Sequence, residues 1–172
     1  MVELRNILYL CAGNSVRSIL AEAITNRAGR GRVRAFSAGS RPKGRVHPQA
    51  IELLIDLGHE TAHLRSKSLE EFTAPGAPAM DLVVTLCDEA AGEPCPLWPG
   101  HPLTAHWSIP DPAAARGPRA IRAALADCYR LIETRVHALL DLPLDGIDPK
   151  DLPHRLRDLG AEEPMRIVAW SL

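Results

Sequence analysis

Short apolar runs alternate with helix-like stretches along most of this chain, and that alternation restricts the possible folds more than any other feature. Three runs are typical of buried strands, 5–10, 33–40 and 80–87, and the stretch 103–112 begins as a fourth strand and runs into a loop. Three stretches space their apolar residues as helices do: 18–29, 47–58 and 120–140. Strands that alternate with helices pair in parallel, so we predict an open α/β sheet with ligands bound at the carboxyl ends of the strands.

The last part of the chain shows the pattern less clearly, and composition sets limits on the number of domains. Residues 148–160 predict a short helix, and 165–170 an edge strand or helical turn. With 172 residues, of which 46% are hydrophobic, the chain is long enough for one domain over 1–172 that buries a core without disulfides.

Charge and hydropathy exclude several classes of function. A formal net charge of -1 provides no broad basic surface, so we expect neither nucleic acid nor an anionic membrane as a partner. No segment approaches the roughly 20 apolar residues of a membrane span, and the N-terminus lacks the layout of a signal peptide. We therefore expect a cytoplasmic protein whose 4 cysteines are reduced unless chemistry uses them.

The loop CAGNSVRS, residues 11–18, follows the first predicted strand and leads into a helix. Such a loop can direct several backbone N–H groups into one concavity, and the helix N-terminus reinforces it as an anion site. We predict that it binds a tetrahedral oxyanion through Ala12, Gly13, Asn14, Ser15, Val16 and Arg17.

Cys11 lies at the floor of this predicted site. A helix N-terminus and an arginine both favour a thiolate over a thiol, and Ser18 can donate a hydrogen bond to the sulfur. We therefore predict that Cys11 attacks the anion that Arg17 binds. The alternative is that Cys11 is a small buried hydrophobic residue and Arg17 a surface residue. The pattern Cys-x2-Asn-x2-Arg-Ser between a strand and a helix favours the nucleophile.

On this motif the chain resembles the low-molecular-weight protein tyrosine phosphatase superfamily. The resemblance implies a flavodoxin-like three-layer α/β sandwich, with a four-stranded parallel sheet and helices on both faces. It also implies a general acid before a proline late in the chain, which Asp111 of Asp111-Pro112 matches. In the phosphatases an aromatic residue usually follows this pair, whereas Ala113 and Ala114 follow here.

Two further cysteines, in TLCDEAAGEPCPLWPG, make the chain similar to the arsenate reductases of the same superfamily, in particular the thioredoxin-coupled ones. That resemblance implies a relay: Cys11 attacks arsenate, Cys87 forms a disulfide with Cys11 as arsenite leaves, and Cys95 takes over the disulfide. It implies no tightly bound cofactor, and as reductant thioredoxin, glutaredoxin or a small thiol. The second hypothesis is a phosphatase that acts on phosphotyrosine or small aryl phosphates through a phosphocysteine at Cys11.

Other interpretations of the same residues compete with these two. Four residues form a series that suggests a structural zinc site: Cys87, Cys95, His101 and His106. The two cysteines are further apart than is usual in zinc fingers, so we predict no metal there. The resemblance also suggests a potassium site near Asn14, Glu22 and Ser37, although Arg65 and the residues after it replace a cation-binding aspartate. A catalytically silent phosphate binder is the third class, and such a protein needs neither a nucleophile nor an acid.

Overall fold

The sequence folds into alternating strands and helices, as predicted. The computed structural model describes residues 3–93, 96 and 98–161. In chain order the elements are β1 Asn6–Cys11, α1 Arg17–Ala28, β2 Arg34–Gly39, α2 Pro48–Asp56, α3 Glu70–Thr73, β3 Leu82–Thr85, α4 Asp88–Gly92, β4 Leu103–His106, η1 Pro112–Ala114, α5 Pro118–Leu140, η2 Leu144–Gly146 and α6 Leu152–Ala161. The stretch 165–170, predicted as a strand or turn, lies outside the described residues.

The strands form a four-stranded sheet in the order β2-β1-β3-β4, and all three pairings are parallel. Cys11 is the last residue of β1 and pairs with Gly39 at the end of β2. Since parallel strands end at one edge, the segments that follow β1, β3 and β4 meet there. The prediction of a flavodoxin-like sheet is confirmed.

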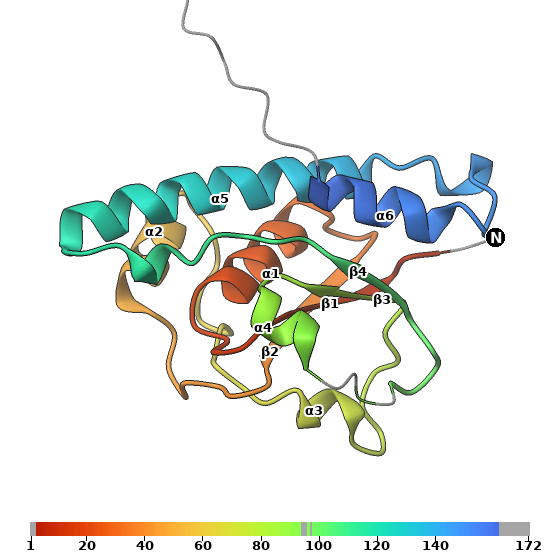
Figure 1. Ribbon diagram of the computed structural model, residues 1–172, viewed down its shortest axis with the longest axis horizontal. Coiled ribbons are helices and arrows are strands. Elements are labelled where there is room, and N and C mark those ends of the chain that lie inside the picture. Colours follow the sequence, from red (N-terminus) through yellow and green to blue (C-terminus); the bar gives the residue numbers. More distant parts are fainter. Residues whose placement is uncertain (1–2, 94–95, 97, 162–172) are drawn as a thin grey trace, which may run out of the picture.

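The two faces of the sheet are covered to different depths. Alternate residues of β1 point to opposite faces: Ile7 and Tyr9 join the larger buried cluster, and Leu8 and Leu10 the smaller one. The larger cluster includes buried residues of α1, α2, α5 and α6. The smaller one is completed by Phe72 of α3 and by single residues from loops. Figure 1 shows this contrast, with α5 and α6 along one side and the short α3 on the other.

Short helices were the main difference between prediction and structure. The sequence predicted no helix between the runs 80–87 and 103–112, yet residues 88–92 form α4. Cys87 caps this helix, because its sulfur accepts a hydrogen bond from the Ala90 N–H, and acidic Asp88 and Glu89 suit its first turn. α4 itself has no buried residue, so no apolar side chain anchors it to the sheet.

Candidate active site

The loop of residues 11–18, called here the oxyanion loop, curls between β1 and α1. Three of its carbonyl groups, those of Ala12, Gly13 and Ser15, accept hydrogen bonds from backbone N–H groups of the segment 41–47. In a trans peptide the C=O and N–H groups point in opposite directions, so the N–H groups of the next residues face away from that segment. The loop therefore has the polarity that an anion site requires.

Cys11 is only 3% exposed, yet its sulfur has a polar partner. The Sγ atom lies 2.9 Å from the Ser18 hydroxyl. Ser18 Oγ also accepts a hydrogen bond from the Asn14 side-chain amide at 2.8 Å, so the proton of the hydroxyl is free to point toward sulfur. A thiolate at Cys11 would thus receive a hydrogen bond from Ser18, as the sequence led us to expect.

Asn14 connects the loop to other parts of the protein through its side chain. It is fully buried and has a positive φ of 42°, a conformation that asparagine tolerates better than most residues. Its side-chain oxygen accepts the backbone N–H of Lys67 at 2.8 Å. Both ends of the amide are therefore used, one on a distant segment of the chain and the other on Ser18.

Arg17 and Asp111 meet at the edge of the loop. Arg17 Nη1 donates to the Ile109 carbonyl at 3.1 Å, and its Nη2 lies 3.7 Å from Asp111 Oδ2. The side chain of Arg17 is 15% exposed and that of Asp111 43% exposed. The other oxygen of Asp111 caps η1 by accepting the N–H of Ala113. A cation that can hold an oxyanion thus lies beside a carboxyl group within reach of solvent.

Cys87 lies against the same loop. Its sulfur accepts the N–H of Ala12 at 3.3 Å and that of Ala90 at 3.4 Å, and the residue is 4% exposed. Ala12 is the neighbour of Cys11 in the chain, so the structure brings the first two predicted relay cysteines together. The third, Cys95, lies outside the described residues.

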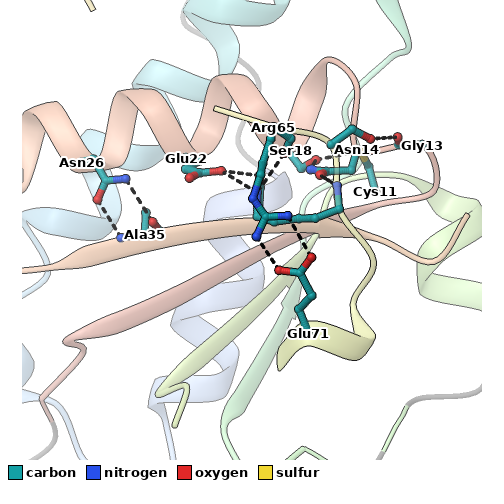
Figure 2. A network of polar contacts seen from close by, with 12 residues as sticks. Cys11, Gly13, Asn14, Ser18, Glu22, Asn26, Ala35, Arg65 and Glu71 are labelled. Carbon is teal, nitrogen blue, oxygen red and sulfur yellow. Dashed lines mark hydrogen bonds and ion pairs between the residues drawn. The ribbon is translucent and has the colours of Figure 1, made fainter. Parts of the chain in front are cut away.

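The suggested potassium site is occupied by an amino group of the protein. Lys67 Nζ lies 3.5 Å from Glu22 Oε2 and 3.4 Å from Ser37 Oγ, and it donates to the Arg65 carbonyl at 3.0 Å. Burial lowers the pKa of this ammonium, and the Glu22 carboxylate opposes the shift. Arg65, which stands where some reductases have a cation-binding aspartate, points outward and pairs with Glu71 (Figure 2).

Of the four residues in the zinc series, Cys95 lies outside the described part of the chain. Among the residues that are described, no group of three or more His, Cys, Asp or Glu side chains is arranged to hold a metal ion. His106 bonds to Thr85 and Asp88, while Cys87 faces the oxyanion loop.

Two residues at the site were missed by sequence reasoning. Gly39 passes so close that a Cβ atom there would lie 2.5 Å from the Ala12 carbonyl oxygen, and only a glycine fits. Lys67 was missed because a lysine in RSKS is typical of a solvated loop. The glycine at the end of a strand was a usable signal, whereas nothing in the local sequence marked the lysine.

Comparisons with known proteins agree with this geometry. A family model described as low molecular weight phosphotyrosine protein phosphatase matches residues 6–150. An arsenate reductase of Bacillus subtilis is 34% identical over 116 residues, which cover 67% of this chain and 80% of the relative.

Solved structures give the same result. A crystal structure of arsenate reductase from Archaeoglobus fulgidus has a TM-score of 0.58 at 27% identity, and the match covers 76% of this chain and 98% of the other. A structure described as an arsenate reductase in the phosphate binding state has a TM-score of 0.61 at 26% identity, covering 79% and 96%. Within the described residues, no helix is long and apolar enough to cross a membrane.

Proposed function

This chain belongs to the low molecular weight phosphotyrosine protein phosphatase family, and on that premise we propose that it reduces arsenate to arsenite. The observation that supports reduction over hydrolysis is the position of Cys87, whose sulfur lies against the amide next to Cys11. Hydrolysis of a phosphoester needs one thiolate, whereas thiol and disulfide exchange needs a second one within reach. The arsenate reductases among its relatives point the same way.

The proposed first step takes place in the oxyanion loop. Arsenate binds to the loop N–H groups and to Arg17, which balance its charge. The Cys11 thiolate attacks arsenic(V), a Cys11 S–As bond forms, and one oxygen leaves as water. Asp111 supplies the proton for that oxygen. Ser18 holds the sulfur in place by its hydrogen bond before the attack.

The second step transfers electrons. The Cys87 thiolate attacks the Cys11 sulfur, an S–S bond forms, and the S–As bond breaks with its electron pair going to arsenic. Arsenic(V) becomes arsenic(III) and leaves as arsenite, while two thiolates have lost two electrons to become one disulfide. Cys95 then attacks Cys87, which forms a Cys87–Cys95 disulfide and releases the Cys11 thiolate.

The cycle needs an external dithiol or thiol to reduce that disulfide. We propose thioredoxin, glutaredoxin or a small thiol in this role and no tightly bound cofactor, because the three cysteines perform the redox chemistry themselves. A cytoplasmic location is part of the proposal, since thiols stay reduced there.

Phosphatase activity is the second candidate, and the pairing of Arg17 with Asp111 favours it. These are the residues that a phosphocysteine mechanism needs besides Cys11. The aromatic wall of a phosphotyrosine slot is harder to find, because Tyr9 and Tyr129 are both buried and bond to Thr25 and His59. We therefore assign small aryl phosphates to this second activity in preference to phosphotyrosine.

Mass spectrometry of the reduced protein after one exposure to arsenate tests the proposal. We expect a Cys87–Cys95 disulfide, and a Cys11–Cys87 disulfide in a Cys95→Ser variant. Cys128→Ser is the matched control, because burial raises the pKa of Cys128 to about 12 and keeps it a thiol. Rapid aryl phosphate hydrolysis with no cysteine linked after arsenate would instead identify a phosphatase.

A further inference from the structure

Lys67 is a buried lysine, with a side chain that is 6% exposed. Its ammonium group contacts Glu22 of α1, Ser37 of β2 and the Arg65 carbonyl of its own segment. Ser37 also donates a hydrogen bond to Glu22, so the carboxylate has two partners. Such a pair is costly to bury, and removal of one member leaves an uncompensated charge on the other.

The main chain of Lys67 joins this pair to the oxyanion loop. Its N–H donates to Asn14 Oδ1, and its carbonyl accepts the N–H of Gly39 at 2.9 Å. An isolated bridge between Gly39 and Ser68 continues this pairing. The segment 65–69 is therefore fixed at the end of β2 and against the loop, with the ammonium group as its inner anchor.

The bond to Asn14 has a consequence for the nucleophile. Because the Asn14 oxygen accepts the Lys67 N–H, its NH2 group must be the end that donates to Ser18. Ser18 Oγ accepts this hydrogen bond with one of its lone pairs, so its own proton is available for donation to the Cys11 sulfur. Three successive hydrogen bonds run from Lys67 to the sulfur, and Figure 2 shows Asn14, Ser18 and Cys11 close together in this network.

We propose that Lys67 is a positioning residue for Cys11: its ammonium group is a built-in cation that balances Glu22 and fixes the main chain that orients Asn14 and Ser18. The charged groups nearest to the ammonium are Glu22, Arg65 and Glu71, and the latter two neutralise each other on the outer side. The inference rests on the proposed function only in taking Cys11 as the nucleophile.

The first test measures the alkylation of Cys11 by iodoacetamide as a function of pH, with the labelled cysteines identified by mass spectrometry. In Lys67→Met the Glu22 carboxylate loses its cation and segment 65–69 loses its inner anchor. Asn14 and Ser18 are then held less firmly against the sulfur, so we expect the midpoint to rise by about one pH unit. The control Lys150→Met changes an exposed lysine on the loop before α6 and should leave the midpoint unchanged. Lower thermal stability of Lys67→Met with an unchanged midpoint would show a merely structural role and overturn the proposal.

A second variant separates charge from packing. Glu22→Gln combined with Lys67→Met removes both charges, and we expect the midpoint to return most of the way to the wild-type value. A double variant as strongly shifted as the single one would contradict the charge balance that the proposal requires.

The wild-type protein provides a test that needs no variant to fold. We expect the same alkylation midpoint and Tm in potassium, sodium and choline chloride at equal ionic strength, because Lys67 already fills the site. A specific gain with potassium or sodium would show that a metal ion is needed and would overturn the inference. The readout needs no arsenate turnover, so a shifted midpoint in an enzyme that does not reduce arsenate would separate this inference from the proposed function.

Discussion

Two regions contain the described thiols of the site: the oxyanion loop contains Cys11, and the segment 87–93 contains Cys87. The loop is fixed by many buried contacts, whereas the segment has few. In the loop, three carbonyl groups bond to segment 41–47, and Asn14 bonds at both ends of its side chain. The Cys87 segment, residues 87–93, has no buried residue in α4. It is joined to the rest of the protein by exposed pairs, Arg41 with Glu89 and His106 with Asp88.

The difference matches what the proposed relay requires of each thiol. Exposed ion pairs contribute little to stability, so the Cys87 segment is held weakly beyond its first residue. A nucleophile must be held in position to react, because misplacement by about 1 Å is enough to slow an enzyme strongly. A relay thiol must instead leave one partner for the next. The fixed geometry around Cys11 suits the attack on the oxyanion, and the weak anchoring of the segment after Cys87 suits the disulfide exchange that follows.

The strongest test of the comparison removes the fixed thiol. Cys11→Ser should lower both arsenate reduction and aryl phosphate hydrolysis more than about a thousandfold, because both reactions begin at this sulfur. Arsenite production and p-nitrophenol release measure the two activities. A circular dichroism spectrum and Tm near those of the wild type would show that the loss is chemical. Substantial activity in either assay would remove Cys11 from that reaction.

Cys87→Ser should divide the two activities. We expect arsenate reduction to fall below detection over repeated turnovers, since the thiolate that attacks the Cys11 sulfur and breaks the S–As bond is removed. Aryl phosphate hydrolysis should stay close to the wild-type rate, because only Cys11 takes part in it. If both activities survive, Cys87 is a capping residue of α4 and nothing more.

Asp111→Asn should lower the rate of phosphate ester hydrolysis by about a hundredfold, which is within the usual range for loss of a general acid. The asparagine keeps the cap on η1 but has no proton to give. The loss should be greatest for phosphate esters with poor leaving groups and small for p-nitrophenyl phosphate. Equal losses across a series of leaving groups would mean that Asp111 serves only to hold Arg17.

The smallest expected effect comes from a pair of glycine variants. Gly39→Ala places a Cβ atom 2.5 Å from the Ala12 carbonyl, and overpacking of this kind costs about 1–3 kcal/mol. Gly92→Ala, at the end of α4, meets nothing within 4 Å and should be close to neutral. Thermal denaturation and phosphate binding compare the two variants. Equal losses in both would end the distinction between a tight loop and a weakly held segment.

The sequence predicted which segments come together better than the contacts among their residues. The alternation of strands and helices placed Cys11, Cys87 and Asp111 at one edge of the sheet, because parallel topology follows from pattern alone. Which atoms bond there depends on segments far apart in the chain. Lys67 is distant in sequence from both Glu22 and Asn14, so no local pattern marked its burial. The cap of α4 was missed for a related reason: cysteine is an unusual residue in that position.

In the strand order β2-β1-β3-β4, the two central strands β1 and β3 are neighbours whose following connections run in opposite directions. From β1 the chain leaves toward β2 on one side, and from β3 toward β4 on the other, so the connections diverge at a topological switch point. The meeting of Cys11 and Cys87 at this edge is therefore a product of connectivity and would persist in a relative without the second thiol. The same edge of the sheet could therefore serve hydrolysis or reduction with no change of architecture.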